Sequence, residues 1–237
     1  MVFGKMPRAS ACSECVFGAA IAAGDSGVAA ACERAAVHRL RPREPLFREG
    51  ERAASIFIIR SGQFKLTSVD SSGREHVLGV FGPGELLGLD SLDDGVSSVS
   101  AVALRSAEVC AIATPDVVEA LRVSPTLGRY TTRRLVGQLR EARALQVCLG
   151  TVRSTAKVAA WLSRHVRACE DGLLCVPRNM TLADLAGVVG LAQETACRAL
   201  GELEREGCIR GEPKRWVIVN RDGLRRAGKM RTPQPKR

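Results

Sequence analysis

Nine cysteines are the residues of this 237-residue chain that point most directly to chemistry. An odd number of cysteines in a chain of this length argues against a disulfide framework and favours metal binding, redox chemistry or buried thiols. Cys12 and Cys15 form a Cys-x-x-Cys pair outside any thioredoxin-like context. Four others are expected to be small buried hydrophobic residues: Cys148, Cys169, Cys175 and Cys208. Because Cys169 and Cys175 bracket an expected turn in a cytosolic protein, we expect no bond between them.

A second group of chemically capable side chains recurs at helical spacing near the C-terminus. Glu194, Cys197 and Arg198 fall on one face of an expected helix. An arginine can donate two hydrogen bonds to O6 and N7 of guanine, and a glutamate can accept one from N4 of cytosine. Thr195 and Arg205 are expected to hold phosphates, which positions a protein on DNA without reading its sequence. The pattern therefore predicts a helix face that reads a base step containing G·C.

These side chains need a rigid support, and residues 180–200 are typical of a helix-turn-helix. Thr181 is expected to cap the first helix and to lie among the DNA-contacting residues. Gly190 closes the turn, and Leu200 belongs to the buried back of the second helix. Residues 207–219 alternate like a hairpin, which favours the wing of a winged helix-turn-helix. An ordinary helical hairpin with a charged exterior is the alternative interpretation.

The positive charge of the chain is also concentrated in its C-terminal third. Lys and Arg total 35 against 25 Asp and Glu, and residues 151–237 hold 17 basic and 9 acidic residues, a net charge of +8 out of +10. This excess predicts a polyanionic partner, with nucleic acid first. We expect neither a membrane-spanning run nor a secretory signal, so the cytoplasm is the expected location.

The spacing of apolar residues changes once in the middle of the chain, from a pattern typical of strands to one typical of helices. Residues 43–112 are short apolar runs broken by glycines, which is typical of a small antiparallel barrel or sandwich. A short helix is predicted from a cap at Thr114 to Val123, followed by a long helix over 126–149. One stripe of this helix has coiled-coil spacing and predicts a dimer seam, with packing on its own barrel as the alternative: Leu135, Leu139, Ala142, Gln146 and Leu149.

A β-roll, a long helix and a winged helix-turn-helix carrying Glu-x-x-x-Arg thus follow in order. In this the chain resembles the cyclic-AMP receptor protein and fumarate-nitrate regulator (CRP/FNR) superfamily, over roughly residues 40–227. The segments that carry the resemblance are LFREGE, IFIIRSGQFKL, GELLGLDSL, EVCAI and MTLADLAGVVGLAQETACRALGELEREG. The resemblance implies an α+β fold and a transcriptional regulator, not an enzyme, that binds DNA as a homodimer and contacts RNA polymerase.

The implied domains follow the same order. They are a cysteine-bearing segment (1–39), a β-roll sensor domain similar to a cyclic-nucleotide-binding jelly roll (40–123), a dimerisation helix (124–150), a winged helix-turn-helix (151–228) and a basic tail (229–237). The tail is expected to be disordered and to attract phosphate.

The recognition helix looks closest to the fumarate-nitrate branch, whose pattern is Glu-x-x-Ser-Arg. Glu194 and Arg198 match that pattern, and Cys197 stands where the branch has Ser. A thiol is a poor hydrogen-bond donor, but it can touch a thymine methyl. The resemblance implies an inverted repeat with half-sites similar to TTGAT, about one helical turn apart.

The effector is a separate question, because family membership does not fix it. A cyclic-nucleotide pocket in this superfamily presents Arg and Ser to the cyclic phosphate. The corresponding stretch here, residues 93–101, has no Arg, and the carboxylates of Asp93 and Asp94 would repel phosphate. Cyclic AMP is therefore disfavoured.

The cysteines are similar to those of the fumarate-nitrate branch. Cys110, in EVCAI, looks like its distant ligand, and Cys12 and Cys15 have its spacing. The resemblance implies a 4Fe–4S cluster on Cys12, Cys15, Cys32 and Cys110. Cys32, expected in or beside a helix over 28–38, would close the set if the turn at 24–27 folds back; Asp25 is an alternative oxygen ligand. Oxygen or nitric oxide would then free the N-terminal arm and weaken DNA binding.

Other interpretations of the sensor stay open. They are a metal-free thiol–disulfide switch at Cys12 and Cys15, a haem bound by some of the three histidines (His38, His76 and His165), zinc on the four thiolates, and inert cysteines with an unrelated effector.

Overall fold

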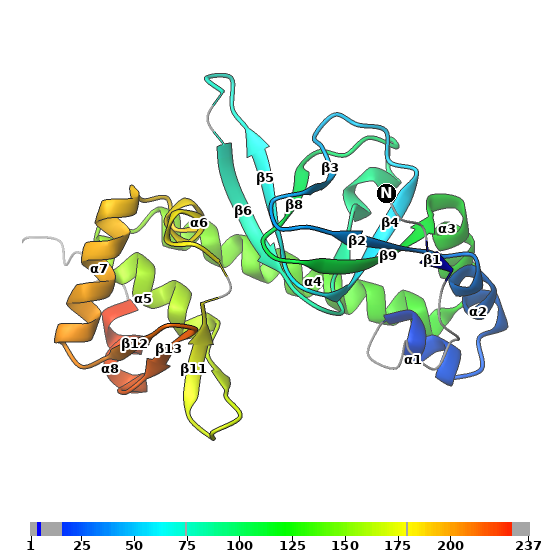
Figure 1. Ribbon diagram of the computed structural model, residues 1–237. Coiled ribbons are helices and arrows are strands. Elements are labelled where there is room, and N and C mark those ends of the chain that lie inside the picture. The colour runs from blue at the N-terminus through cyan, green and yellow to red at the C-terminus, as the bar shows by residue number, and fades with distance from the viewer. Residues whose placement is uncertain (1–3, 6–15, 74, 179, 229–237) are drawn as a thin grey trace, which may run out of the picture. The chain divides into compact units, whose positions relative to one another are not determined.

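The computed structural model describes residues 4–5, 16–73, 75–178 and 180–228. The chain divides into two compact units, residues 1–140 and 141–237, and each is described by itself (Figure 1). No helix among the described residues is long and apolar enough to cross a membrane. Residues Cys12, Cys15 and the tail at 229–237 lie outside the described part of the chain.

The N-terminal unit is a β-roll of two antiparallel sheets, as the glycine-punctuated runs predict. One sheet has the order β1-β2-β9-β4-β7 and the other β3-β8-β5-β6. The bounds of the first sheet are β1 Gly4–Lys5, β2 Ala36–Leu40, β9 Ala107–Ala113, β4 Ser55–Ser61 and β7 Leu86–Leu87. Those of the second are β3 Pro45–Phe47, β8 Ser100–Ala103, β5 Phe64–Val69 and β6 Glu75–Phe81. A turn at residues 70–73 joins β5 to β6, with the amide of Gly73 donating to the carbonyl of Asp70.

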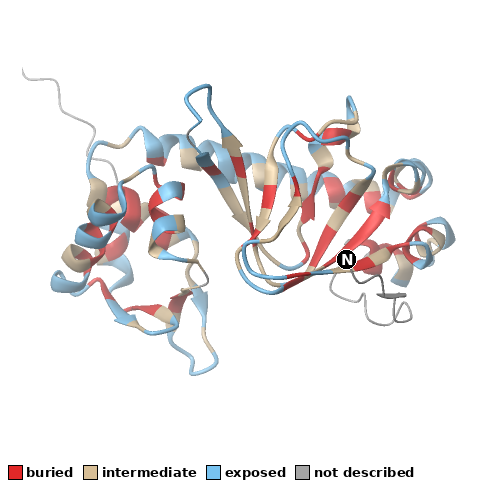
Figure 2. Cartoon of the chain, turned by 45° about the horizontal axis from the view of Figure 1, so that its top comes forward, coloured by how far each residue is buried: buried red, intermediate tan, exposed pale blue. Residues whose placement is uncertain are grey.

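Buried side chains of β4 and β9 point alternately to the two faces of the first sheet and contribute to two cores, one on each face. Ile59 and Val109 lie in an apolar core shared with strands of the second sheet. Ile58 and Cys110, one residue along each strand, lie in a second core formed with the helices. Successive side chains of a strand point to opposite faces, so each strand serves both cores. Figure 2 shows the buried residues concentrated on these strands and on the helices beside them.

Short helices cover the outer face of the first sheet. They are α1 Val16–Ala22, α2 Ser26–Glu33 and α3 Thr114–Val123. The predicted helix over 28–38 is wrong beyond Glu33, because residues 36–40 pair as β2 with β9 and extended pairing excludes helix there. The helix α3 has the predicted span, but its N-cap is Ala113 and not Thr114.

The long helix α4 (Pro125–Leu149) matches the predicted dimerisation helix closely. Ser124 precedes it, and its buried hydroxyl accepts from the amide of Leu127 at 3.0 Å, which satisfies one of the unpaired amides of the first turn. The boundary between the two units falls within this helix, between Arg140 and Glu141.

The C-terminal unit is a winged helix-turn-helix. Its helices are α5 Ser154–Arg164, α6 Leu182–Val188, α7 Gln193–Arg205 and α8 Arg221–Gly228. Its sheet has the order β10-β11-β13-β12, with β10 Arg167–Ala168, β11 Leu174–Pro177, β13 Arg215–Ile218 and β12 Ile209–Glu212. Trp161 and Leu162 on α5 are buried, and the expected wing is the β12–β13 hairpin.

The cysteines of this unit correct one expectation. Cys148 and Cys208 are buried, as predicted, but Cys169 and Cys175 form a disulfide with their Cα atoms 6.1 Å apart. The argument from the reducing cytosol was wrong here because the β10–β11 hairpin brings the two thiols together.

Candidate DNA interface and sensor region

The helix-turn-helix begins with a capping box at Thr181. The hydroxyl of Thr181 accepts from the amide of Asp184 at 3.1 Å and donates to its carboxylate at 2.6 Å, while that carboxylate accepts from the amide of Thr181. The expected cap is therefore present, and it engages the Thr181 hydroxyl locally. Contact between Thr181 and DNA remains a prediction.

Gly190 forms the turn between the two helices, with φ at +62°. A Cβ at this position would lie 2.6 Å from Cδ2 of Leu149. Glycine is therefore required at this position for two reasons, the left-handed backbone conformation and the close approach of the Leu149 side chain. The amide of Leu191 then donates to the carbonyl of Ala186 at 2.9 Å, which closes the end of α6.

The second helix, α7, has two sharply different faces. Its buried face consists of Ala196, Ala199, Leu200 and Leu203. Glu194, Cys197 and Arg198 are all exposed, and Thr195 is half-buried. The guanidinium of Arg198 lies 3.5 Å from the hydroxyl of Thr195 and forms no ion pair among those found in the described part of the chain. The predicted grouping of these side chains on one exposed face is confirmed.

Two carboxylates on α7 fix the helix within its unit. Glu202 accepts from the hydroxyl of Thr155 on α5. Glu204 accepts from the backbone amide of Gly211 on β12 at 2.8 Å. These contacts join α7 to the helix behind it and to the wing, so its exposed face has a defined orientation in the C-terminal unit.

The wing carries basic side chains in two different states. Arg210 and Lys214 are exposed. Arg215 instead donates to Asp171 at 2.7 Å and to Glu212 at 2.6 Å. Its guanidinium holds the pKa of both carboxyls below their ordinary values. The charge of Arg215 is thus engaged internally. Arg210 is exposed but also lies 3.3 Å from the carboxylate of Glu212, whereas Lys214 is exposed with no ion pair found among the described residues.

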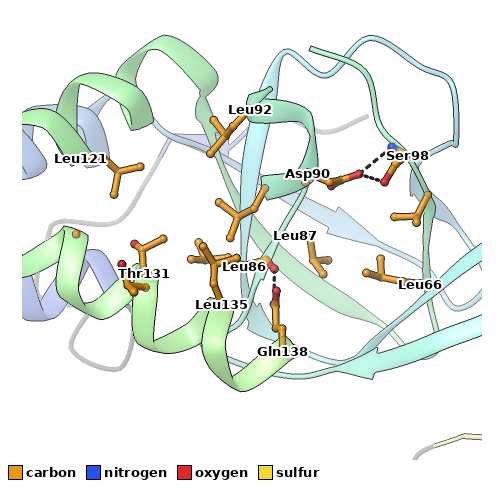
Figure 3. Close-up of a pocket in the computed structure, with 15 residues that line it drawn as sticks. Leu66, Leu86, Leu87, Asp90, Leu92, Ser98, Leu121, Thr131, Leu135 and Gln138 are labelled. Atoms are coloured by element: carbon orange, nitrogen blue, oxygen red, sulfur yellow. Dashed lines mark hydrogen bonds between the residues drawn. The ribbon is translucent and has the colours of Figure 1, made fainter. Parts of the chain in front are cut away.

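The N-terminal unit contains a cavity of about 540 Å³ between the β-roll and α4 (Figure 3). Its lining is largely apolar: Leu66, Leu86, Leu87, Leu89, Leu92, Val99, Leu121 and Leu135. The side chain of Gln138 reaches from α4 to donate to the carbonyl of Leu86 at 3.2 Å. The side-chain amide of Gln138 is therefore paired within the protein.

One carboxylate in the cavity bears directly on the kind of ligand. Asp90, on the 3-10 helix η2 (Leu89–Leu92), accepts from the amide of Ser98 at 2.8 Å and from its hydroxyl at 2.6 Å. A hydroxyl and an amide of this kind are the donors that a bound phosphate would require. Here a side-chain anion already takes them, which agrees with the prediction against a cyclic nucleotide.

Two of the four predicted cluster ligands lie in one place. Cys32, at the end of α2, is 3% exposed, and Cys110, on β9, is 4% exposed. Both belong to the apolar core between the first sheet and the helices, to which α1 contributes Phe17 and Ala20. No three metal-ligating side chains come together among the described residues, and Cys12 and Cys15 lie outside them. The thiolate donor set fits an iron–sulfur cluster chemically, and the described residues contribute half of it.

Asp25, the alternative oxygen ligand, has a hydrogen-bond partner within the protein, and its role as a ligand stays a prediction. The carboxylate of Asp25 accepts a hydrogen bond from the hydroxyl of Ser124, the buried residue that precedes α4. A contact between residues 99 apart in the chain could not be read from the local sequence. It engages Asp25 and joins the start of α2 to the start of the long helix.

Each of the three histidines contacts another side chain, and the ring of His38 lies edge-on to that of Phe57 with the centroids 6.4 Å apart. His76 lies 2.7 Å from the carboxylate of Asp70. His165 stacks on Trp161 in the C-terminal unit, whereas His38 lies on β2 of the N-terminal unit. Burial lowers the pKa of His38 and of His165. Each histidine thus has a different partner, and the haem interpretation stays a prediction.

The predicted seam leaves apolar side chains exposed along α4. Leu135, Leu139 and Leu149 are between 43% and 49% exposed. Ala142 and Gln146 are exposed as well. Val136 and Val147, which were not predicted as seam residues, are also exposed, at 41% and 54%. Leu135, at the N-terminal end of this stripe, also lines the cavity beside the β-roll.

Sequence reasoning missed two pairs, Asp90 with Ser98 and Asp171 with Arg215. Asp171 and Arg215 are 44 residues apart, and nothing in the spacing signals them. The residues 169–175 did signal a turn, and a turn flanked by two cysteines is the signal from which the disulfide could have been inferred.

Comparisons with known proteins agree with this architecture. The cyclic nucleotide-binding domain model matches residues 37–123, and the Crp-like helix-turn-helix domain model matches residues 156–227. The chain is 30% identical to a cyclic AMP receptor protein of Thermus thermophilus, covering 74% of this chain and 80% of that protein. It is 29% identical to the fumarate and nitrate reduction regulatory protein of Escherichia coli, covering 76% and 74%. The solved structure of FixK2 from Bradyrhizobium japonicum matches with a TM-score of 0.72 at 22% identity, covering 83% and 98%.

Proposed function

Because the chain belongs to the CRP/FNR family of DNA-binding transcriptional regulators, we propose that it is a homodimeric regulator that reads an inverted repeat through α7. The observation that carries the proposal is the exposed face of α7, with Glu194 and Arg198 outward and four apolar residues behind. In this proposal Arg198 reads guanine and Glu194 reads cytosine within half-sites similar to TTGAT. Cys197 lies against a thymine methyl, and Thr195, Thr181 and Arg205 lie near phosphates.

The test separates base reading from phosphate contact. Substituting Arg198→Ala should cost roughly 1–3 kcal/mol of binding free energy and relax the base preference at one position of each half-site. Arg205→Ala, on the same helix, is the matched control and should weaken binding to all sequences alike. Fluorescence anisotropy on a set of single-base variants of the duplex measures both. An unchanged preference in Arg198→Ala contradicts the assignment of α7.

The second part of the proposal is the dimer. The stripe on α4, with Leu135, Leu139 and Leu149 nearly half-exposed, supports a seam with a second copy of this chain. A two-fold dimer carries two α7 helices and so matches a DNA inverted repeat. A regulator of this kind works where chromosomal DNA lies, so we place it in the cytoplasm, where activation involves contact with RNA polymerase.

The third part is the sensor. We infer that Cys32 and Cys110, together with Cys12 and Cys15, hold a 4Fe–4S cluster, which when bound supplies an oxygen-labile link. Support comes from the shared apolar core, which contains both Cys32 of the N-terminal segment and Cys110 of the β-roll. The contact from Asp25 to Ser124 couples that same segment to the start of α4. A change in how the segment packs is then transmitted to the dimerisation helix.

Anaerobic purification tests the sensor. The protein should be brown, with iron and acid-labile sulfide each near ~4 per monomer. Cys110→Ser should lose the absorption, whereas Cys148→Ser, a buried thiol of the C-terminal unit, should keep it. Colourless anaerobic protein that binds DNA equally in air would exclude the cluster and favour the thiol switch at Cys12 and Cys15. A cyclic nucleotide is not part of the proposal, since Asp90 already takes the donors of Ser98.

A further inference from the structure

The Cys169–Cys175 disulfide closes a tight hairpin between β10 and β11. The amide of Cys169 donates to the carbonyl of Leu173 at 2.8 Å, and that of Gly172 donates to the carbonyl of Cys169 at 2.9 Å. Gly172 has φ at +77°, a conformation that favours glycine. The turn is therefore defined by its own backbone hydrogen bonds. The Cα separation of 6.1 Å falls within the usual range for a disulfide.

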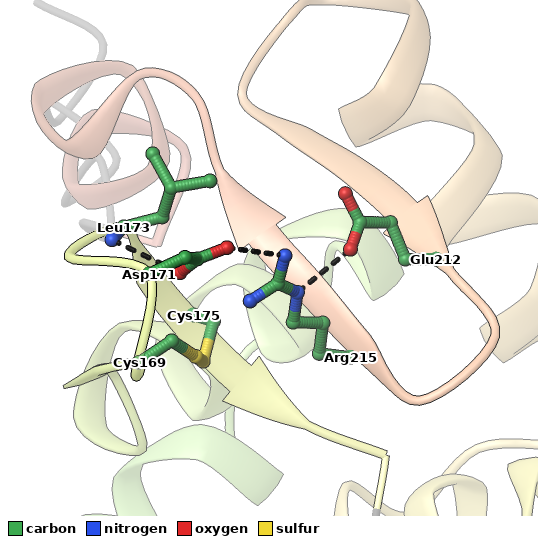
Figure 4. Close-up of a disulfide and its surroundings, with 6 residues drawn as sticks. All are labelled: Cys169, Asp171, Leu173, Cys175, Glu212 and Arg215. Carbon is green, nitrogen blue, oxygen red and sulfur yellow. Dashed lines mark hydrogen bonds and ion pairs between the residues drawn. A yellow bond between two sulfur atoms is a disulfide. The ribbon is translucent and has the colours of Figure 1, made fainter.

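The same loop is joined to the wing (Figure 4). Cys175 lies opposite Val217 of β13, so β11 and the wing share one sheet. Asp171, inside the disulfide loop, accepts from Arg215 at the start of β13, and Arg215 also donates to Glu212 at the end of β12. A chain of contacts thus runs from the disulfide loop across both strands of the wing.

The two sulfur atoms differ in access. Cys175 is 1% exposed, whereas Cys169 is only partly buried. A small reagent therefore reaches Cys169 first, and Cys175 acts as the resolving thiol from within the hairpin. Rates of thiol–disulfide exchange depend on this kind of access.

We propose that Cys169 and Cys175 are a reversible thiol-oxidation site that reacts with small-molecule disulfides and sets the order of the wing. The site lies in the DNA-binding unit and is separate from the cysteines of the proposed cluster. The inference rests on the proposed function, because wing order has a consequence only for a protein that binds DNA.

The reaction balances with glutathione disulfide as oxidant. The thiolate of Cys169 attacks one sulfur of glutathione disulfide, breaking its S–S bond and releasing one glutathione. The thiolate of Cys175 then attacks the mixed disulfide, forms the Cys169–Cys175 bond and releases the second glutathione. The protein loses two electrons and two protons, and the two glutathione thiols carry them.

Oxidation should strengthen DNA binding. The closed loop holds Asp171 against Arg215, which keeps the two wing strands and the exposed Arg210 and Lys214 in place. An exposed ion pair contributes little by itself, but a loop fixed by a covalent bond removes the freedom that the wing would otherwise lose on binding. Reduction restores that freedom and weakens the complex.

The redox couple itself is measured first. The full chain is equilibrated in reduced and oxidised glutathione, trapped with N-ethylmaleimide and analysed by peptide mass spectrometry. We expect Cys169 and Cys175 to be fully alkylated in reducing buffer and linked in oxidising buffer, reversibly. A pair that stays alkylated at every glutathione ratio overturns the proposal.

DNA affinity is measured next, on the inverted-repeat duplex in both buffers. The oxidised protein should bind about three- to tenfold more tightly than the reduced protein, since ordering one or two side chains and a short loop costs about that much. Cys169→Ser/Cys175→Ser should bind like the reduced protein in both buffers. Cys148→Ser, which changes a buried free thiol of the same unit, is the control and should keep the difference. Asp171→Asn should keep the disulfide but lose the gain in affinity.

Hydrogen exchange distinguishes failure of this inference from failure of the proposed function. Amides of residues 209–218 should exchange about three- to tenfold faster in the reduced protein, whether or not DNA is present. Protein that binds no DNA in either state contradicts the proposed function, and the exchange rates then decide the redox site alone. Equal exchange and equal affinity in the two states overturn the redox site and leave the proposed function intact.

Discussion

The two units treat their polar groups in opposite ways. In the N-terminal unit, Asp90 accepts from the amide and hydroxyl of Ser98, and Gln138 donates to the carbonyl of Leu86, so these polar groups of the cavity are paired internally. In the C-terminal unit, Glu194 and Arg198 on α7 extend into solvent, as do Arg210 and Lys214 on the wing. The difference separates a region whose response depends on internal packing from one whose partner is bound at the surface. Each prediction below either disrupts this contrast or makes it sharper.

The largest effect should come from the core beneath the N-terminal helices. Phe17 is 1% exposed in the apolar core that holds Cys32 and Cys110. Phe17→Ala should cost about 3–5 kcal/mol of local stability because it removes a ring from a closely packed site. Hydrogen exchange should speed up across residues 16–40 and 107–113 and stay unchanged in residues 154–218. Equal acceleration in both regions would mean that the two units do not respond separately.

The next effect concerns the seam on α4. Leu139→Asp places a charge on the apolar stripe and should give monomers in sedimentation velocity. The affinity for the full inverted repeat should fall about 100-fold or more, because the second α7 no longer binds at high effective concentration. Val69→Asp, an equally exposed valine on β5, is the control and should stay dimeric. If the Leu139→Asp protein remains dimeric, the stripe on α4 is not the dimer seam.

A smaller effect is expected at the turn of the helix-turn-helix. Gly190→Ala should cost roughly 1–3 kcal/mol, since alanine meets both the left-handed backbone and the side chain of Leu149. Gly207→Ala is the control, with φ at +66° and no atom within 4 Å of an added Cβ. The difference between the two variants in chemical denaturation isolates the contact with Leu149. Equal losses would show that backbone strain accounts for the whole effect.

The smallest effect is a pH dependence of the wing. Arg215 lowers the pKa of Asp171 and Glu212 in the folded protein. Their ion pairs therefore stabilise the fold above the pKa values of the unfolded chain, and this stability is lost as the pH falls through the folded values. Hydrogen exchange at residues 209–218, corrected for intrinsic rates, should lose protection between about pH 5 and about pH 3. Asp171→Asn should flatten this dependence, and an unchanged profile in that variant would remove Asp171 as a cause.

Reasoning from sequence worked best where a local rule decided the outcome. The span of α3, the burial of Trp161 and Leu162 and the exposed face of α7 all follow from helical periodicity, which a short stretch of chain already displays. The helix predicted over 28–38 failed past Glu33, because pairing of β2 with β9, more than 60 residues away, overrides the local pattern.

In the candidate site, too, local arrangements were predictable from the sequence and long-range contacts were not. Glu194, Cys197 and Arg198 were predictable because they lie within two turns of one helix. The contact between Asp25 and Ser124 was not predictable, because the two residues are distant in the sequence.

The amino-acid sequence by itself determined the order of the elements, the outward face of α7 and the basic character of the C-terminal region, because spacing and composition express these directly. Only the tertiary structure decided that Cys169 bonds Cys175, that Asp171 holds the wing through Arg215, and that Asp90 occupies the donors of Ser98. The physical reason is that such contacts depend on how turns and sheets bring side chains together in space. Periodicity records which way a side chain faces, but not which side chain it meets there.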